Sequence, residues 1–200
     1  IRKTELITAL SSLPPQWQLT PVGSNKAPYR KAWQSETLER SAIATEIKSG
    51  RAKGYGLLTG TKCGGILAID ADGEAAHELL TRHGELPPTV AFTSGKPGRC
   101  QYLFRVEQEY WDIIKTTKLN TGVKGDDGKD QLLELRWDGC QSVLPPSVHP
   151  QTGRYQWVNS PDSVEIAECP IWVIDLMLNS GAPRNRELTP NSEAPRNREL

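Results

Sequence analysis

The sequence predicts an α+β protein with two sheet-based lobes. Helices and strands interleave in the first part of the chain, whereas strands cluster in the second part. This order fits two lobes better than a single doubly wound sheet, in which strand and helix alternate throughout. The chain has 200 residues, which suffices for one large domain or two small lobes with an apolar core.

The N-terminal part predicts two helices and two strands. Apolar residues recur at helical spacing in the first helix, which stops before Pro14. Ser35 or Thr37 can cap the second helix, and Gly50 ends it. The expected ranges are a helix at 4–13, a strand at 17–22, a helix from 35 or 37 to 48, and a strand at 55–59.

The remaining helices and strands are likewise predicted from apolar runs that lie between turn residues. The apolar residues Ile66 to Ile69 predict a buried strand, and Gly84 is the expected stop of the helix that follows. The expected ranges are strands at 66–70, 89–93, 101–106, 131–137, 142–144 and 154–158, and helices at 74–83, 108–117 and 171–178.

Composition indicates a soluble globular protein with no net charge. No apolar run approaches the ~20 residues of a membrane helix, and no signal peptide is visible. The four cysteines form no C-x-x-C pair, which favours reduced thiols in a cytoplasmic protein. Residues 1–55 carry nine Lys or Arg against four Glu, an excess of five positive charges that suggests an anionic ligand.

The C-terminal end is different in character. The decamer at 179–188 returns almost unchanged at 191–200, and both copies are polar and contain proline. Because neither has an apolar period, we interpret 179–200 as a disordered linker leading to a further C-terminal domain.

Two carboxylates follow the buried strand in Gly64-Gly-Ile-Leu-Ala-Ile-Asp-Ala-Asp-Gly73. On an extended chain Asp70 and Asp72 point to the same face, ~6.5–7 Å apart. Two acids at this spacing can hold a pair of divalent cations, and Mg²⁺ prefers such oxygen ligands. The alternative is a solvated strand end, because Asp-Gly also favours a turn.

A third acid lies in the strand expected at 131–137. Glu134 and Arg136 share one face of that strand. If the face lines a site, Glu134 is a third oxygen donor and Arg136 is a partner for phosphate or carboxylate. An exposed face or a simple ion pair is the alternative.

Two loops carry candidate phosphate contacts. The Gly-rich turn after Thr93 offers Ser94, Lys96 and Arg99, and such turns can hold phosphate through backbone N–H groups and positive charge. Ser147 and His149 follow a rigid pair of prolines. A hairpin turn with solvated basic residues and an exposed loop histidine are the simpler readings of these segments.

Several common sites are excluded by their missing motifs. The chain has no G-x-x-x-x-G-K-[ST] loop, no H-E-x-x-H and no G-x-S-x-G elbow. The glycines at 54–60 do not have the spacing of a dinucleotide fingerprint.

Taken in order, six segments resemble the N-terminal domain of bifunctional DNA primase/polymerases, within the archaeo-eukaryotic primase superfamily. The resemblance covers residues 6–178. The segments are Trp17…Pro21…Lys26-Ala-Pro…Trp33, Gly56-Leu-Leu-Thr-Gly60, Ile69-Asp-Ala-Asp-Gly73, Thr93-Ser-Gly, Glu134-Leu-Arg…Asp-Gly139 and Pro145-Pro-Ser-Val-His-Pro…Gly-Arg-Tyr-Gln-Trp157.

This resemblance implies a catalytic domain at 1–178, with an α/β lobe, an RNA-recognition-like palm and an active-site cleft between them. It implies a template-directed nucleotidyltransferase that initiates or extends primers with two Mg²⁺ or Mn²⁺ ions held by Asp70, Asp72 and Glu134. It also implies a single-stranded DNA template, a primer, dNTP or NTP, a fused helicase or other replication domain, and a prokaryotic source such as a plasmid, phage or mobile element. The implied nucleotide contacts are Ser94, Lys96, Arg99, Arg136, Ser147 and His149.

The chain departs from the family at the second motif. The family usually has a histidine there that contacts the nucleotide, and here Cys100 or Gln101 stands near its position. Arg99 or His149 is a candidate for this contact. A DNA-binding replication initiator with weak or no catalysis remains an alternative, and a sugar-nucleotide transferase fits the Asp-x-Asp motif only.

Overall fold

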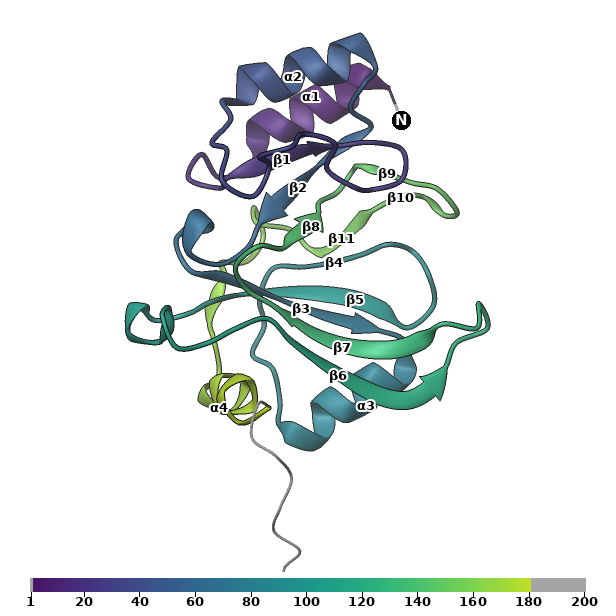
Figure 1. Cartoon of the computed structure of the whole chain (residues 1–200). Helices are drawn as coiled ribbons and strands as arrows, with labels where there is room; N and C mark the ends of the chain where they lie inside the picture. The colour runs from purple at the N-terminus through teal and green to yellow at the C-terminus, as the bar shows by residue number, and fades with distance from the viewer. Residues whose placement is uncertain (1, 181–200) are drawn as a thin grey trace, which may run out of the picture.

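A computed structural model describes residues 2–180 and shows an α+β protein with two lobes (Figure 1). The N-terminal lobe contains an antiparallel three-stranded sheet with the order β1-β2-β8. The second lobe contains a seven-stranded sheet in which β11-β4-β5-β3-β7-β6 are neighbours and β12 pairs with β5 in parallel. The two-lobe α+β architecture predicted from the sequence is therefore confirmed.

The N-terminal lobe packs two helices against its small sheet. Leu6 and Leu10 of α1, and Ile43 and Ile47 of α2, are spaced by four residues and are buried, so each helix presents one apolar stripe to the core. The elements of this lobe are α1 (Lys3–Ser12), β1 (Leu19–Val22), α2 (Arg40–Ser49), β2 (Gly54–Leu58), β8 (Gln141–Val143), β9 (Val148–His149) and β10 (Gly153–Arg154).

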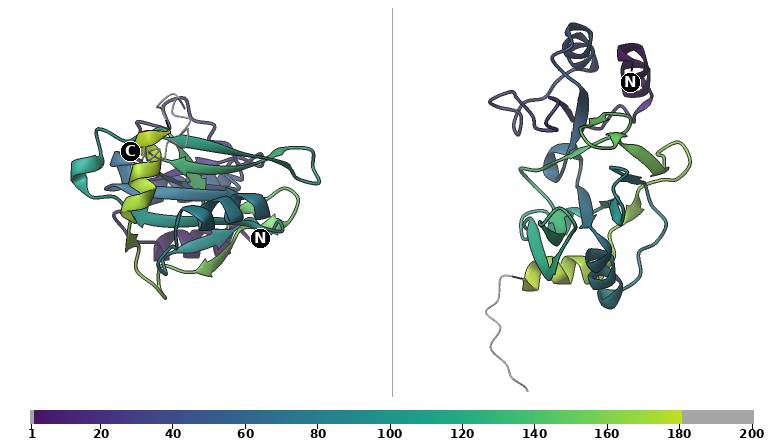
Figure 2. Two further views of the ribbon diagram at one scale, coloured as in Figure 1. Left: turned by 90° about the horizontal axis from the view of Figure 1, so that it is seen from below. Right: turned by 90° about the vertical axis from the view of Figure 1, so that its right-hand side faces the viewer.

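The second lobe is a sheet with helices on one face. Figure 2 shows α3 and α4 on the side of the sheet that faces away from the N-terminal lobe. The elements are β3 (Ile66–Asp72), α3 (Glu74–His83), β4 (Ala91–Thr93), β5 (Arg99–Arg105), β6 (Thr117–Lys124), β7 (Asp130–Arg136), β11 (Gln156–Asn159), β12 (Ala167–Glu168) and α4 (Ile171–Asn179).

The large sheet lies between two hydrophobic cores. Leu67, Ile69 and Ala71 of β3 pack with α3 and α4 in one core. Ile66 and Ala68 point to the opposite face and join the core of the N-terminal lobe. Since neighbouring residues of a strand face opposite sides, β3 contributes to both cores. The lobes are therefore joined by a shared apolar core.

Two of the crossovers between the lobes contact each other. The first crossover runs from β2 to β3 and the second from β7 to β8. Asp138 Oδ1 in the second accepts hydrogen bonds from the backbone N–H of Thr61, at 2.7 Å, and from its hydroxyl, at 2.9 Å. Gly60 lies beside this contact with φ 82°, where a Cβ atom would come within 2.1 Å of Asp138 Oδ1. A glycine is required there by both the backbone angle and the close approach.

Most expected elements are present, but the expected helix at 108–117 is wrong. Only a 3₁₀ turn forms at Gln108–Tyr110, and Thr117 already begins strand β6. Trp111 bends back instead, and its indole N–H donates to the carbonyl of Val106 at 2.9 Å. The apolar residues of this segment therefore fill a compact loop rather than one helical stripe.

Three boundaries also differ from expectation. Helix α2 begins at Arg40 and not near Ser35 or Thr37, and its N-cap residue Glu39 makes no side-chain cap bond. Strand β3 continues through Asp72, and β5 begins at Arg99. Both acids and Arg99 are consequently fixed in paired strands. Most of the decamer repeat expected to form a linker lies outside the described residues.

Candidate active site

The two acids of β3 lie where the apolar face of the strand becomes polar. Asp70 and Asp72 share the face of Ala68, which belongs to the core between the lobes. In the sheet, Asp70 stands opposite Gln101 of β5 on one side and Glu134 of β7 on the other. Directly paired residues in antiparallel strands point to the same face, so the register of β3 and β7 brings the predicted acids together.

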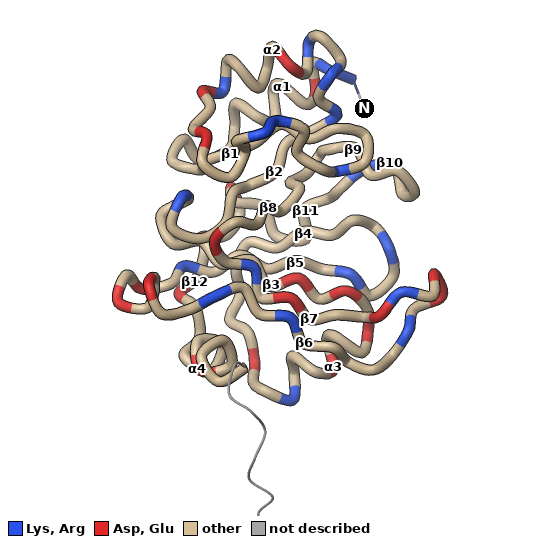
Figure 3. Tube along the Cα trace, in the orientation of Figure 1, with Lys and Arg blue, Asp and Glu red and all other residues tan. Residues whose placement is uncertain are grey.

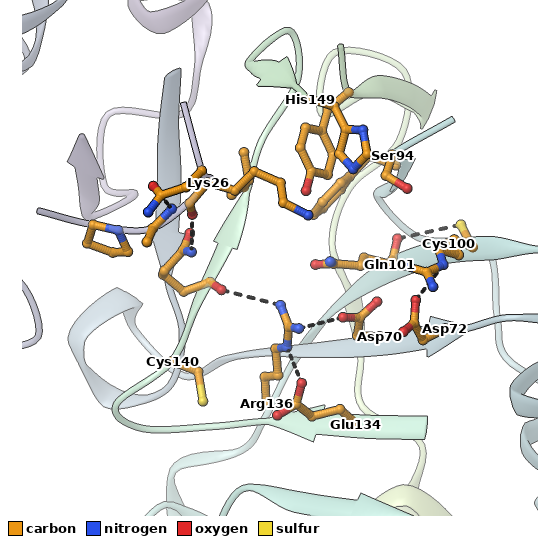
Figure 4. A pocket seen from close by; sticks show the side chains of 18 of the residues that line it. Lys26, Asp70, Asp72, Ser94, Cys100, Gln101, Glu134, Arg136, Cys140 and His149 are labelled. Atoms are coloured by element: carbon orange, nitrogen blue, oxygen red, sulfur yellow. Dashed lines mark hydrogen bonds and ion pairs between the residues drawn. The ribbon is translucent and has the colours of Figure 1, made fainter. Parts of the chain in front are cut away.

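A cavity of about 560 Å³ opens above this polar face, between the two lobes. Figure 3 shows the acids of β3 and β7 side by side, with basic residues close to them. Figure 4 shows Asp70, Asp72, Glu134 and Arg136 on the floor of the cavity, with Lys26 and His149 above. The floor of the cavity thus carries three acids among basic residues, and Lys26 brings a positive charge to its roof.

Each of the three acids is paired with a basic side chain. Arg136 bridges two of them: its Nη2 lies 2.5 Å from Asp70 Oδ2, and its Nε lies 2.8 Å from Glu134 Oε2. Glu134 Oε1 is also 2.9 Å from the ammonium of Lys118, and Asp72 Oδ1 is 2.7 Å from Nε of Arg99. The floor is therefore an ion-pair network rather than a cluster of free carboxylates.

Burial and charge act in opposite directions on these groups. Burial raises the pKa of Asp70, with help from Asp72 and Glu134, although Arg136 opposes the shift. Burial also acts to raise the pKa of Glu134, but Arg136 and Lys118 together outweigh it and lower that pKa. The two acids raise the pKa of Arg136 against its own burial. Both Glu134 and Arg136 are consequently held in their charged forms.

The donor set fits a divalent cation by its chemistry, but the carboxylates are engaged elsewhere. Carboxylate oxygens are the ligands that Mg²⁺ and Mn²⁺ prefer, and three of them share one sheet face. However, no group of three His, Cys, Asp or Glu within residues 2–180 is arranged to hold a metal ion. A cation at this position has to compete with Arg136, Arg99 and Lys118 for the same oxygens.

The turn between β4 and β5 places positive charge at one end of the cavity. Lys96 Nζ and Arg99 Nη2 both lie near Asp127 Oδ2, at 3.4 and 3.5 Å. Asp127 belongs to the loop between β6 and β7, and its Oδ1 accepts from the backbone N–H of Lys129 at 3.2 Å. Ser94 of the same turn lines the cavity. The turn is a ready site for an anion, and a carboxylate of the protein now occupies part of it.

His149 is buried in the roof of the cavity, with only 2% of its surface exposed. The backbone N–H groups of Gln151 and Thr152, which can only donate, point at its Nδ1 from 3.4 and 3.2 Å. The Oγ1 atom of Thr152 also lies 2.8 Å from Nδ1, so three neighbours engage this nitrogen of the ring. Burial, together with the charges of Lys26, Lys96 and Arg99, lowers the pKa of His149 to about 4. His149 is therefore a neutral hydrogen-bond donor near pH 7.

A comparison with protein families identifies this arrangement. Residues 9–172 match the family described as "Bifunctional DNA primase/polymerase, N-terminal". The chain belongs to this family. Membership implies a nucleotidyltransferase of the DNA primase/polymerase type, which acts on DNA and nucleotides, and the family generally uses divalent metal ions. No curated protein matches the chain. Within residues 2–180, no helix is long and apolar enough to cross a membrane.

The primase/polymerase domain brings most of the sequence-predicted residues to one cavity. Asp70, Asp72, Glu134, Arg136, Ser94, Arg99 and His149 all line it. Lys96 lies beside Arg99 through their shared partner Asp127.

Ser147 is placed elsewhere. Its fully buried hydroxyl accepts from the backbone N–H of Tyr55 at 3.0 Å and lies 3.2 Å from the Tyr55 carbonyl. Gly54 leaves the room for this contact, since a Cβ atom there would come within 2.2 Å of Ser147. In this structure Ser147 fastens the segment that carries His149 to β2 and does not reach the cavity.

The register also distinguishes Cys100 from Gln101 at the second motif of the primase/polymerase domain. Gln101 pairs with Asp70 and shares its face, whereas Cys100 pairs with Ala71 on the opposite face. The Oε1 atom of Gln101 is shielded from solvent and has no hydrogen-bond partner among the described residues. Of these two residues, Gln101 is therefore the one whose side chain shares the sheet face of Asp70.

Sequence reasoning missed two charged residues that line the cavity, Lys26 and Lys118. Lys26 was visible only as part of the Lys-Ala-Pro segment of the family resemblance. Lys118 lies on β6, which was not expected as a strand. An alternating pattern over Thr117–Leu119, opposite the strand with Glu134, is the signal that could have revealed it.

Proposed function

We propose that this domain adds nucleotides to a primer on a single-stranded DNA template, with Asp70, Asp72 and Glu134 holding two Mg²⁺ or Mn²⁺ ions. The observation that carries this proposal is the common sheet face of three carboxylates on the floor of a cavity that Lys26, Arg99, Lys118 and Arg136 also line. When bound, the metal ions would neutralise charge on the triphosphate and lower the pKa of the primer 3′-OH.

The residues around the acids have separate roles in this proposal. Ser94, Lys96 and Arg99 bind the triphosphate, and the Nε2–H of His149 donates to one of its oxygens. Arg136 orients Asp70 and Glu134 before substrate arrives, because it contacts both, and it helps to keep Glu134 ionised. Ser147 holds the roof segment in position through Tyr55. The substrate nucleotide, dNTP or NTP, replaces Asp127 at the basic turn.

Primer extension tests the proposal directly. The purified chain is incubated with labelled dNTP or NTP, Mn²⁺ or Mg²⁺, and a single-stranded template with and without primer. Asp70→Asn keeps the size of the side chain but removes its charge, and we expect at least ~10²-fold less product. Asp162→Asn, an exposed acid outside the cavity, is the matched control. Full activity of Asp70→Asn would contradict the proposal.

A DNA-binding initiator module without catalysis is the second candidate. Two observations favour it: Gln101 replaces the expected histidine, and all three acids are ion-paired. In the same assay, template-dependent incorporation by the wild-type chain eliminates this candidate. Absence of product in every lane, together with binding of labelled single-stranded DNA, supports it.

A further inference from the structure

Lys26 occupies a backbone conformation that ordinary residues avoid. The backbone N–H of Lys26 donates to the carbonyl of Gly23 at 3.1 Å, which closes a turn directly after β1. Lys26 has φ 68°, and it is the only residue other than glycine with positive φ among those described. This left-handed region costs a side chain ~1 kcal/mol or more, and glycine would occupy it without strain. Strain of this kind is often retained where the side chain has a task.

The turn that carries Lys26 is anchored to the wall of the cavity. The backbone N–H of Gly23 donates to the carbonyl of Ala27 at 3.0 Å, and Asn25 Oδ1 accepts from the N–H of Ala27 at 3.1 Å. The carbonyl of Lys26 accepts from Nε2 of Gln141, on β8, at 3.2 Å. The backbone around Lys26 is thus fixed on both sides, and only its side chain is free to reach into the cavity.

The ammonium of Lys26 lacks the partner that the other basic residues have. Lys96 and Arg99 pair with Asp127 and Asp72, whereas no described carboxylate makes an ion pair with Lys26. Figure 4 shows its side chain extending from the N-terminal lobe toward His149 and Ser94. Burial lowers the pKa of Lys26, and the charges of Lys96, Arg99 and Lys129 act in the same direction. Three cations therefore converge here, and Lys26 is the one that has no ion-paired carboxylate among the described residues.

We propose that Lys26 is the contact of the N-terminal lobe with the polyphosphate of the nucleotide. Its ammonium meets phosphate oxygens that Arg99 and Lys96 hold from the other lobe, so the bound triphosphate spans the two lobes. An anion placed among these groups offsets the repulsion between them and gives Lys26 its missing partner. The proposal rests on the proposed function for the identity of the ligand, and on the convergence of these cations for its charge.

Binding of inorganic tripolyphosphate to the full chain, followed by titration calorimetry, tests this inference without catalysis. Lys26→Met removes the ammonium but keeps the length of the side chain, and we expect about tenfold weaker binding. Lys31→Met is the matched control, because Lys31 is exposed on the same long loop, and it should bind like the wild type. Lys26→Arg keeps the charge and should stay within about threefold of the wild type.

Lys26→Gly separates a structural role from a binding role. Glycine relieves the positive φ, so this variant should melt at the same temperature as the wild type or higher, yet bind tripolyphosphate as weakly as Lys26→Met. Wild-type affinity in both Lys26→Met and Lys26→Gly would overturn the inference. If binding depends on Lys26 but the wild-type chain incorporates no nucleotide, the inference stands and the proposed catalytic function fails.

Discussion

At the scale of single residues, the site contains polar groups that the unliganded fold leaves poorly satisfied. Gln101 has a shielded carbonyl oxygen without a partner, and Lys26 has a strained backbone and no ion pair. Both side chains belong to the wall of one cavity. Such features cost stability, so their presence together points to a ligand that satisfies them.

Replacement of Gln101 tests whether this side chain lowers the stability of the fold and strengthens ligand binding. Gln101→Leu removes the unpartnered oxygen while keeping similar volume, so we expect the free energy of unfolding to rise by about 1 kcal/mol. Nucleotide binding should weaken, because the amide that faces Asp70 from β5 is lost. Urea unfolding and nucleotide titration measure the two effects. A less stable variant with unchanged nucleotide affinity would refute this reading of Gln101.

The buried His149 makes stability depend on pH in a defined window. Its pKa is about 4 in the folded protein, against about 6.5 in an unfolded chain. The unfolded state therefore takes up the proton first as pH falls, and this residue destabilises the fold progressively from pH 6.5 down to 4. The charged groups facing it are Lys26, Lys96 and Arg99, and each of these cations opposes protonation of the ring.

Unfolding in urea between pH 7.5 and 4.5 isolates the contribution of His149. We expect the wild type to lose roughly 1–3 kcal/mol more stability over this range than His149→Gln, since each pKa unit corresponds to about 1.4 kcal/mol. Other acids titrate equally in both proteins and cancel in the difference. Parallel pH profiles of the two proteins would show that the ring is not held neutral by its surroundings.

Sequence reasoning could identify the residues whose charged side chains occur at alternate positions of a strand. Asp70, Asp72 and Glu134 were predictable, because acids at alternate positions beside apolar runs point to one face. The pairing of Arg136 with both Asp70 and Glu134 depends on strand register, which no local pattern fixes. The position of Lys26 depends on a turn that brings a distant loop over the sheet.

At the scale of elements, the β6–β7 hairpin is the part of the site that sequence patterns described least well. Strand β6 is an edge strand with mostly exposed residues, so it lacks the apolar run by which strands are recognised. Its loop nevertheless reaches the β4–β5 turn and places Asp127 against Lys96 and Arg99. The carboxylate of Asp127, on this hairpin, would therefore compete with a bound anion for Lys96 and Arg99.

Removal of this competitor should improve nucleotide binding. Asp127→Asn takes away the charge facing Lys96 and Arg99 but keeps the oxygen that accepts from the Lys129 N–H. We expect the KM for nucleotide to fall about two- to fivefold, the modest size typical of partly exposed ion pairs. Asp126→Asn, an exposed neighbour on the same loop, is the control. An unchanged or higher KM in Asp127→Asn alone would show that the contact is not competitive.

At the scale of the whole molecule, the lobes are held by a common core and by paired crossovers. The two-lobe fold could be predicted, since helices and strands interleave early and strands cluster late. The sharing of one core could not, because it requires Ile66 and Ala68 of one strand to face the N-terminal lobe. The two lobes that bound the cavity are consequently held in one relative position.

The contact between the crossovers should stabilise this arrangement measurably. Asp138→Ala removes both hydrogen bonds to Thr61, and we expect the free energy of unfolding to fall by about 1–2 kcal/mol. Asp138→Asn retains an acceptor oxygen and should recover most of this loss. Urea unfolding of the three proteins decides the matter: equal stability of the Ala and Asn variants would mean that the hydrogen bonds contribute little.

The alternation of apolar and acidic side chains along β3 has a consequence for misfolding of the protein. A slip of one residue in its pairing would turn Asp70 and Asp72 onto the core of α3 and α4, and would leave Ile69 and Ala71 in the cavity. Two buried, unpaired carboxylates would then oppose folding altogether. A misregistered molecule that is folded but inactive is therefore strongly disfavoured. In a purified sample, the fraction of folded molecules should therefore equal the fraction in which Asp70 and Asp72 face the cavity.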